Sequence, residues 1–452
     1  MPAFTELPMI HAHTRPLPTQ QSPPPSNRNG GRTLDSEWLG RMCKDAGADD
    51  VGFVAIDRPE LERDRKDILR TFRHTKTLIS FVVKMNREPI RSPARSVANL
   101  EFHHTGDQVN DIARFIVRAL EAQGLRALNP AMGFPLEMER FPGKIWVVSH
   151  KTVAVAAGLG KMGIHRNVIH PKFGNFILLG TILLDAEVMT QNKPIEYNPC
   201  LECKLCVAAC PVGAIGSDGQ FNFSACYTHN YREFMGGFTD WVGQVAESHT
   251  AEQYRQKVSD VESASMWQSL SFGANYKAAY CLAVCPAGED VISPFQSDRK
   301  QFVTDIVKPL QHKREPIYAV AGTDAVDHVA KRFPHKQIKL VRSGLRPRSI
   351  QGFLTGLPLV FQRNQSNGLA ATYHFTFTGK ENRTATVLIR DNTVTVLDGK
   401  QNQADLHITA DSQTWLGFVA KEKSLFWAML TGQIRVKGPL NLFKAFGRCF
   451  QG

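Results

Sequence analysis

Four cysteines and a proline in one short stretch constrain this chain more than any other feature of its sequence. Residues 198–215 read NPCLECKLCVAACPVGAI, with two, two and three residues between successive cysteines and Pro211 directly after the last. A 4Fe–4S cluster takes one thiolate at each corner iron, and a C-x2-C-x2-C loop supplies three of them. The fourth cysteine of such a run, followed by proline, ligates the other cluster of a pair. The run therefore predicts half of a two-cluster iron–sulfur module and not a zinc site, which usually has two separated cysteine or histidine pairs.

The cysteines needed to complete two clusters lie downstream of this run. FSACYTHN contains Cys226, and AAYCLAVCPAG contains Cys281 and Cys285, again with a following proline. The remaining two cysteines, Cys43 and Cys449, are expected to be ordinary thiols. The expected ligands are, for the first cluster, Cys200, Cys203, Cys206 and Cys285, and, for the second cluster, Cys210, Cys226 and Cys281.

The second cluster lacks a fourth thiolate. Ala278 stands where a C-x2-C-x3-C-P run would have its first cysteine. Three outcomes are open: a 3Fe–4S cluster, a non-cysteine ligand, or a corner iron that carries water or an exogenous ligand. His229, three residues after Cys226, is the nearest non-cysteine ligand in sequence. We rank the non-cysteine ligand and the open corner above the three-iron form, because the other seven ligands are present.

Length and composition indicate a globular protein of two or three domains. The chain has 452 residues and no apolar run long enough to span a bilayer. Residues 1–33 are rich in proline and polar residues and read as a disordered tail without an export signal. No disulfide framework is implied, so a reducing cytoplasm is the expected location. The net charge of +12 attracts anionic partners, but no Lys/Arg block is dense enough to predict nucleic acid binding.

Hydrophobic patterns in the first half of the chain predict an α/β fold. Strands are expected at 77–85, 144–150 and 175–185, and an amphipathic helix at 106–124. A glycine-rich apolar segment, 156–175, lies directly before the last of these strands.

The C-terminal portion reads as a small α+β domain. Two strands alternate apolar residues with threonine around a hairpin turn at Asp391–Asn392. A further strand runs into a helix capped near Asp411 or Ser412. A second helix stops at Gly432, and a short strand and a terminal amphipathic helix follow.

The glycine segment and the cysteine run together resemble the epoxyqueuosine reductase and reductive dehalogenase group. The shared pattern is A-G-L-G-x-x-G, a histidine-containing segment, G-x-F-x-x-L-G-x-I-L-x-D and a two-cluster module, over about residues 35–290. The resemblance implies a nitroreductase-like domain that binds a cobalamin, two clusters that pass electrons to its cobalt, and a ferredoxin- or flavodoxin-type electron donor. Glycines let a backbone approach a large cofactor closely, although they also serve as tight turns. The resemblance assigns the cofactor to Gly158, Gly160, Gly163, His165, Gly174 and Gly180.

One departure from that group concerns catalysis. Its epoxyqueuosine reductases carry a catalytic aspartate upstream of the glycines, and the corresponding position in this chain is Lys144. Glu137 and Glu139 lie just upstream, but no acid occupies the position itself. We therefore do not expect tRNA epoxide reduction, and we assign no catalytic residue. Lys144 could assist a leaving anion, but the preferred interpretation is an ordinary surface lysine.

Residues of about 349–452 resemble the sterol-carrier-protein type of lipid-binding domain. The match is carried by the strand-rich run, the helix at 411–420 and the closing segment GQIRVKGPLNLFKAF. The resemblance implies a sheet and helices that enclose an apolar tunnel for a fatty acyl or sterol-like ligand. The residues that could line this tunnel, or simply form the core, are Trp415, Phe418, Phe426, Trp427, Leu430, Leu442 and Phe446.

Together these features predict an α/β, nitroreductase-like corrinoid domain, an inserted or following ferredoxin-type 4Fe–4S module and a C-terminal α+β lipid-binding domain. The expected function is a cobalamin-dependent iron–sulfur reductase acting on a hydrophobic substrate. The alternative is an electron-transfer protein without corrinoid, docked to lipid or to a partner by its C-terminal domain. The expected boundaries are 1–33 for the tail, 34–190 for the corrinoid domain, 191–290 for the cluster module, 291–348 for a connector and 349–452 for the lipid domain.

Overall fold

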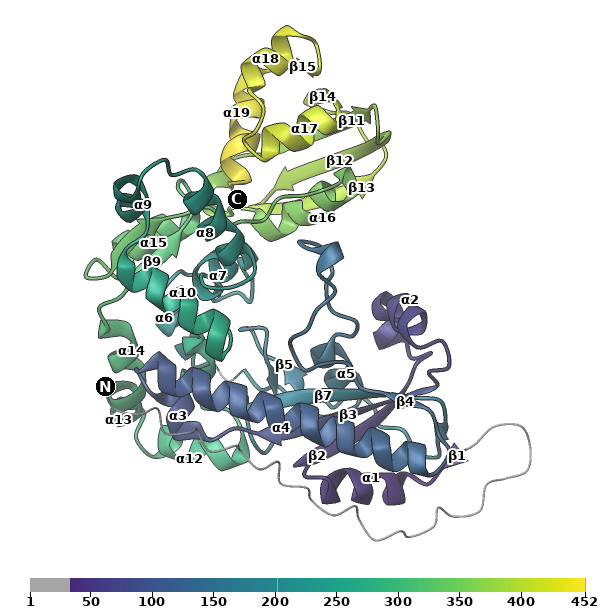
Figure 1. Ribbon diagram of the computed structural model, residues 1–452. Coiled ribbons are helices and arrows are strands. Elements are labelled where there is room, and N and C mark those ends of the chain that lie inside the picture. The colour runs from purple at the N-terminus through teal and green to yellow at the C-terminus, as the bar shows by residue number, and fades with distance from the viewer. Residues whose placement is uncertain (1–32, 201, 452) are drawn as a thin grey trace, which may run out of the picture.

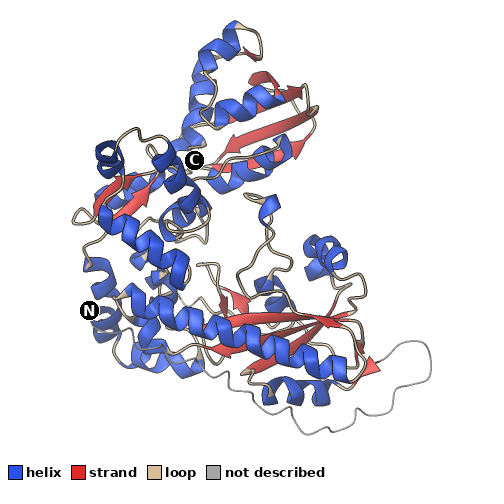
Figure 2. Ribbon diagram, in the orientation of Figure 1, coloured by secondary structure: helices blue, strands red, loops and turns tan. Residues whose placement is uncertain are grey.

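The structure is a computed structural model that describes residues 33–200 and 202–451. The tail expected at 1–33 lies outside the described residues except for Thr33. Two sheets lie at opposite ends of the molecule, and a helical region joins them along one side (Figure 1). Figure 2 shows that the two large sheets lie at the ends and that a short pair of strands lies in the helical region between them. Within the described residues, no helix is both long and apolar enough to cross a membrane.

The first part of the chain forms a four-stranded antiparallel sheet covered on both faces. The strand order is β2-β3-β7-β4, and every neighbouring pair is antiparallel. Successive residues of β3 point to opposite faces, so Ile79 and Phe81 pack with α1 and α4 while Leu78 packs under α2 and α5. The elements are α1 Ser36–Asp45, β2 Asp50–Ala55, α2 Glu62–Thr71, β3 Thr77–Lys84, α3 Arg87–Arg91, α4 Arg95–Ala122, β4 Ala127–Leu128, α5 His150–Ala156 and β7 Ile177–Leu184.

The expected strands at 77–85 and 175–185 and the expected helix at 106–124 are confirmed, although α4 begins earlier, at Arg95. The strand expected at 144–150 is wrong, because residues 144–149 form a loop that leads into α5. Val148 is buried beneath α2 and α5, and the apolar run is thus satisfied by packing without a neighbouring strand. Short pairs complete this part: β1 Thr33–Leu34 with β8 Glu187–Val188, and β5 Lys161–Met162 with β6 Val168–Ile169.

The cysteine-bearing helices share one core with the segment that follows them. Phe295, Leu310 and Ile317 pack in the same buried cluster as Cys206 and Cys210. The stretch expected to be only a connector is thus folded, and it contains two parallel strands joined by a helix. The elements are α6 Leu205–Ala209, α7 Phe223–Asn230, α8 Gly236–Ala246, α9 Ala251–Lys257, α10 Asp260–Phe272, α11 Tyr280–Val284, α12 Glu289–Ser297, α13 Arg299–Phe302, α14 Lys308–His312, β9 Pro316–Ala319, α15 Asp324–Arg332 and β10 Gln337–Leu340.

The C-terminal part is a five-stranded sheet with helices. The hairpin turn and the helix cap that the sequence predicts in this part are both present. Asp391 and Asn392 both have positive φ, as a two-residue hairpin turn requires. Asp411 caps α17 by accepting a hydrogen bond from the Thr414 backbone N–H at 2.8 Å. The strand order is β13-β12-β11-β14-β15, with only β11 and β14 parallel. The elements are α16 Ile350–Val360, β11 Ala371–Thr378, β12 Arg383–Arg390, β13 Thr393–Asp398, β14 Leu406–Asp411, α17 Ser412–Val419, α18 Leu425–Leu430, β15 Ile434–Lys437 and α19 Leu440–Cys449.

Specific contacts hold the C-terminal part against the cysteine-bearing helices. Helix α16 packs against α7, which carries Cys226. The buried Gln362 side-chain oxygen accepts a hydrogen bond from the Asp324 backbone N–H at 3.1 Å, and Arg363 forms an ion pair with Asp218. The two parts therefore meet at a defined position beside α7.

Candidate functional site

The structure brings four cysteines from two distant segments around one small cavity. The backbone N–H of Ile164 donates to Cys200 Sγ at 3.3 Å, so the α/β part closes this cavity on one side. The cysteines that line it are those expected for the first cluster, namely Cys200, Cys203, Cys206 and Cys285.

The three cysteines expected for the second cluster line a different and much larger cleft. Cys210, Cys226 and Cys281 contribute to its wall together with Ala278. Burial raises the pKa of Cys281 to about 12, the charge of Cys210 acts in the same direction, and the Lys151 ammonium opposes it. Burial likewise raises the pKa of Cys226, with the same opposition from Lys151.

The donor chemistry of the first set fits a 4Fe–4S cluster. Burial disfavours bare thiolates, whereas a bound metal cluster compensates their charge. Four thiols surround the small cavity, as a cubane requires. Across residues 33–200 and 202–451, no three His, Cys, Asp or Glu side chains are grouped to hold a single metal ion. The second set offers the same chemistry but is one thiol short.

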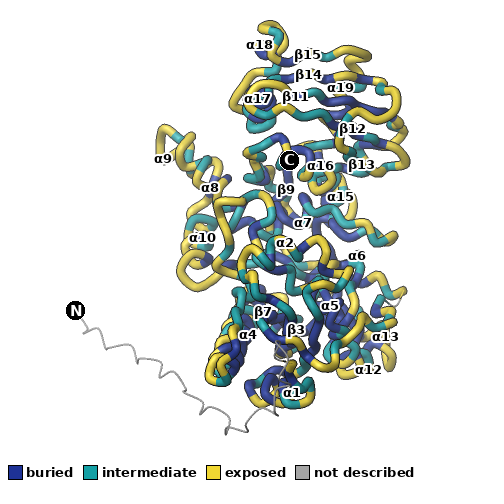
Figure 3. The backbone as a smooth tube through the Cα atoms, turned by 90° about the vertical axis from the view of Figure 1, so that its right-hand side faces the viewer, coloured by how far each residue is buried: buried dark blue, intermediate teal, exposed yellow. Residues whose placement is uncertain are grey.

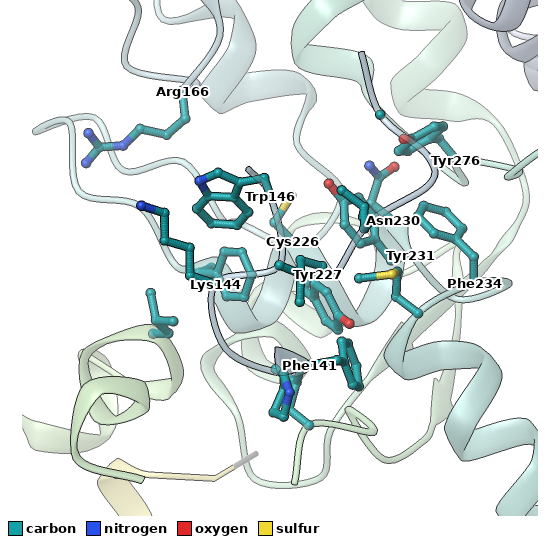
Figure 4. Close-up of a pocket in the computed structure, with 18 of the residues that line it drawn as sticks. Phe141, Lys144, Trp146, Arg166, Cys226, Tyr227, Asn230, Tyr231, Phe234 and Tyr276 are labelled. Atoms are coloured by element: carbon teal, nitrogen blue, oxygen red, sulfur yellow. The ribbon is translucent and has the colours of Figure 1, made fainter. Parts of the chain in front are cut away.

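The large cleft has a volume of about 1880 Å³, whereas typical ligand pockets measure roughly 300–1,000 Å³. All three parts of the chain contribute to it, and Figure 4 shows Cys226 beside Trp146 and Asn230 in its wall. The C-terminal part supplies an apolar side, with Phe353, Trp415 and Phe446 among the lining residues. A cofactor and an apolar ligand could therefore occupy this cleft together.

Positive charge predominates among the ionised side chains of the cleft. Among the described residues that line the cleft, only Asp64, Asp107 and Glu139 carry negative charge. Lys144 is neutralised, because its Nζ lies 2.5 Å from Asp64 Oδ1 and 2.9 Å from Asp67 Oδ2. Lys144 is thus a half-buried, doubly paired residue of the cleft, and the interpretation as an ordinary surface lysine is wrong. The basic lining residues are Arg63, Arg95, Arg140, Lys144, Lys151, Arg166, Arg348 and Lys421.

An aromatic wall adjoins the second cysteine set and was missed in the sequence. Tyr231 stacks on Phe234 with ring centroids 4.6 Å apart, and Tyr276 packs edge-on against Phe234 at 4.9 Å. Figure 4 shows these three rings grouped on one side of the cleft. The aromatic run YTHNYREF directly after Cys226 was the available signal. His150 was missed as well, and its ring bonds Thr181 Oγ1 at 2.8 Å.

The glycines that were expected to contact a cofactor lie against other parts of the protein chain. A Cβ at Gly174 would lie 2.0 Å from Ala287 O, and one at Gly180 would lie 2.1 Å from the Phe81 ring. None of the five glycines lines the large cleft. Close packing thus explains why these positions are glycine without invoking a ligand. The glycines that line the cleft and have open space where a Cβ would lie are instead Gly133, Gly356 and Gly447.

His165, the remaining residue expected at the cofactor, lines both cavities. Its Nδ1 accepts from the Asn167 backbone N–H at 3.2 Å, and its Nε2 lies 3.3 Å from the Asn175 side-chain amide. Burial lowers the pKa of His165 to about 4, and the charge of Lys151 adds to the shift. His165 is therefore a neutral ring wedged between the two cavities.

Only part of the expected lipid tunnel lining faces the cleft. Trp415, Phe418 and Phe446 do line it, and Leu442 packs at the edge of the core. The expectation is wrong for the remaining three residues, because α18 turns them outward. Their exposed fractions are 68% for Phe426, 62% for Trp427 and 65% for Leu430.

Comparisons with known proteins give one family match and several partial relatives. Residues 361–451 match the SCP-2 sterol transfer family. The epoxyqueuosine reductase of Lactococcus garvieae is 25% identical over 146 residues, which are 32% of this chain and 34% of that protein. The Staphylococcus aureus epoxyqueuosine reductase is 35% identical over 80 residues, 18% of this chain and 20% of that protein. The chain is thus similar to epoxyqueuosine reductases over part of its length. It spans a fifth to a third of the length of these two relatives.

Solved structures that match parts of this chain include an epoxyqueuosine reductase and a reductive dehalogenase. An epoxyqueuosine reductase with an epoxyqueuosine-modified tRNA stem loop shares 16% identity and a TM-score of 0.35, covering 66% of this chain and 82% of that one. A reductive dehalogenase described as B12-dependent shares 16% identity and a TM-score of 0.35, covering 54% and 38%. The expectation against a nucleic acid partner is not supported by these comparisons.

Proposed function

We propose that this chain is a corrinoid-dependent iron–sulfur reductase that acts on an apolar substrate held by its C-terminal part. One observation carries the proposal. The second cysteine set and the apolar side of the C-terminal part line the same cleft. A redox centre and a hydrophobic binding surface thereby share one space, as reduction of a hydrophobic molecule requires.

The two cysteine sets suggest a direction for the electrons. The first set surrounds a separate small cavity, whereas the second set lines the cleft. Bound clusters supply one-electron transfer, so the first set would receive electrons and the second would deliver them. Backbone N–H groups at Ile164 and Ala214 each donate to a cysteine sulfur at 3.3 Å, which favours the reduced cluster. The basic chain would attract an acidic donor of the ferredoxin or flavodoxin type.

A corrinoid fits the size and lining of the cleft. The open space beside Gly133 and the flat rings of Trp146 and Tyr276 offer surfaces to a large planar group. When bound, a corrinoid supplies a cobalt that exchanges electrons with the cluster and the substrate. His165 stays a proposed cofactor contact because it lines the cleft. The contact role of the five predicted glycines remains a prediction.

Anaerobic purification followed by an absorption spectrum and mass identification of bound molecules tests this proposal. We expect two clusters and, after reconstitution with cobalamin, a stoichiometric corrinoid spectrum. Two clusters without any corrinoid binding would favour the second candidate described below. Stoichiometric zinc, or no iron at all, would overturn both.

Probe binding to the full chain tests the hydrophobic part of the proposal. A fluorescent fatty-acyl probe should bind, and Phe418→Asp should weaken binding at least tenfold because Phe418 lines the cleft. Phe426→Asp is the matched control, since Phe426 points into solvent and its change should leave probe affinity intact. Equal loss in the two variants would contradict a ligand site in the cleft.

A second candidate is an electron-transfer protein without corrinoid that docks on anionic lipid. Helix α18 presents Phe426, Trp427 and Leu430 to solvent at the end of the molecule farthest from the α/β part (Figure 3). The segment 421–444 around them holds five basic residues and one acidic residue. Aromatic side chains with flanking cations are the composition that binds an anionic bilayer surface.

Co-sedimentation with phosphatidylcholine vesicles, with and without phosphatidylserine, tests this docking surface. Phe426→Ser/Trp427→Ser should abolish binding to the anionic vesicles. Trp267→Ser is the control, because Trp267 on α10 is similarly exposed, at 59%, but lies elsewhere. Loss of binding with the control alone, or no binding by the unaltered chain, would exclude α18 as the lipid contact.

A further inference from the structure

The two cysteine segments repeat one backbone conformation. Lys204 precedes α6 with φ of 49°, and Ala279 precedes α11 with φ of 54°, both in the left-handed region. Each helix then ends at an extended cysteine, Cys210 with φ of −65° and Cys285 with φ of −69°. Left-handed conformation is uncommon in residues other than glycine, so its recurrence at matched positions fixes the alignment of the two segments.

This alignment places Ala278 at the position of Cys203. Each stands immediately before the left-handed residue, and each is followed three residues later by a cysteine. Cys203 lines the small cavity, whereas Ala278 lines the large cleft. The place of the missing thiolate therefore faces the space that the C-terminal part shares.

His229 is not built to replace that thiolate. Its Nδ1 accepts a hydrogen bond from the Tyr318 backbone N–H at 3.3 Å, so the single proton of the neutral ring sits on Nε2. A ligating histidine has the opposite arrangement, with a lone pair on the ligating nitrogen and a proton on the other. His229 is 1% exposed, lines the cleft, and its Nε2 has no partner among the described residues. It therefore offers a hydrogen-bond donor and not a metal ligand.

The side chain of Asn230, the next residue of α7, already forms a hydrogen bond within the protein. Its side-chain oxygen accepts the Ala278 backbone N–H at 3.0 Å. This bond holds the Ala278 segment against α7, beside Cys226. Neither residue one turn after Cys226 thus supplies a free lone pair to the vacant position.

The charges around the second set favour an anion. Lys151 lines the same cleft as Cys226 and Cys281. Its Nζ donates to Arg166 O at 2.7 Å and to Asn167 Oδ1 at 3.0 Å, which leaves one N–H for a ligand. Arg95 is buried, lines the cleft, and its Nε has no partner among the described residues. Two cations and the His229 N–H donor are therefore present, and an apolar wall from the C-terminal part borders the same cleft.

We propose that the second cluster has no fourth protein ligand and that its open iron binds the carboxylate of a long-chain apolar acid. This inference rests on the two-cluster function proposed above and names the substrate class for that site. Carboxylate oxygens are established ligands of protein-bound iron. The apolar chain of the acid would lie against Phe353, Trp415 and Phe446, which line the same cleft. Arg95 and Lys151 would balance the negative charge of the carboxylate, and His229 would donate a hydrogen bond to it.

Spectroscopy on the full chain with its clusters tests the open corner, using palmitate as the probe. Mössbauer spectra of iron-57-labelled, anaerobic protein should show about one iron in eight as distinct. Palmitate should shift that component, and oxygen-17-labelled palmitate should broaden the paramagnetic resonance of the reduced second cluster. Hexadecanol, which has the same chain without a carboxylate, should do neither. Ala278→Cys should remove the distinct iron and the palmitate response, because a thiolate then fills the corner.

Ala274→Cys is the matched control. Ala274 lines the same cleft but lies outside the repeated ligand positions, so this variant should behave as the unaltered chain does. A palmitate response that survives Ala278→Cys, or is absent from the unaltered chain, would overturn the inference. So would loss of one iron in His229→Asn, or a three-iron signal that persists in anaerobic protein supplied with ferrous iron. Iron content separates these results from failure of the proposed function, which would leave fewer than two clusters per chain.

Discussion

The two cysteine sets have the same backbone conformation but line different cavities. Both carry a left-handed residue before a short helix and a proline after its last cysteine. The first set has four thiols around a small cavity, and the α/β part donates an N–H to one of them. The second has three thiols and lies on the cleft shared by all parts of the molecule. One backbone unit thus occurs twice in the molecule with different numbers of thiols and different neighbours.

The largest expected effect comes from Cys203→Ala. Iron and sulfide content should fall by about half, because a cubane needs its thiolates while the second set keeps its own. Cys43→Ala is the control, since Cys43 is buried in the α/β core far from both sets. An unchanged iron content would contradict the assignment of Cys203 as a ligand. Loss of both clusters would show that the two cysteine sets depend on each other.

A smaller effect is expected from Gly174→Ala, which acts on the wall of the first set. The new Cβ would meet Ala287 O at 2.0 Å, close to Cys285, in addition to the strain of a φ of 64°. Gly368→Ala isolates the strain, because Gly368 has φ of 73° and no atom within 4 Å of its Cβ position. We expect the control to cost about 1–2 kcal/mol of stability and Gly174→Ala clearly more. Thermal unfolding and resistance of the iron to chelators would measure the difference, and equal losses would refute tight closure of the first set.

The smallest expected effect is a pH dependence carried by one histidine beside each set. Burial lowers the pKa of both His165 and His229 to about 4, against about 6.5 in an unfolded chain. The unfolded chain therefore binds more protons between these values, and stability should fall as pH drops from about 6.5 toward 4. Each ring should cost about 2 kcal/mol at pH 5. The difference in unfolding free energy between pH 7 and pH 5 should be about 2 kcal/mol smaller in His165→Asn and in His229→Asn than in the unaltered chain, and an unchanged difference would disprove their burial as neutral rings.

Local chemistry made much of the fold readable from the sequence. The Asp391–Asn392 turn, the Asp411 cap and the strands at 77–85 and 175–185 depend on neighbouring residues, and all are present. The two groups of cysteines also followed from spacing, although their role as ligands stays a prediction. The mixed α/β class is confirmed.

Features that depend on contacts between residues far apart in the chain could not be predicted from the sequence. Trp427 and Trp415 are both tryptophans on amphipathic helices, but only the turn of α18 decides that one is exposed and the other buried. The segment at 144–149 has a strand-like composition but packs as a loop. Gly174 and Gly180 are glycines because Ala287 and Phe81 approach them, which no local pattern reveals.

The docking of the C-terminal part beside α7 has a kinetic consequence. Gln362 and the Arg363–Asp218 pair tether an apolar ligand surface next to the second cysteine set. Covalent linkage replaces the bulk concentration of a partner by an effective concentration, which reaches about the millimolar range for short connections. On the proposed function, a poorly soluble molecule held on this surface would meet the second cluster without first escaping into water. Turnover would then be governed by how fast the C-terminal part is loaded, and not by the amount of free ligand in solution.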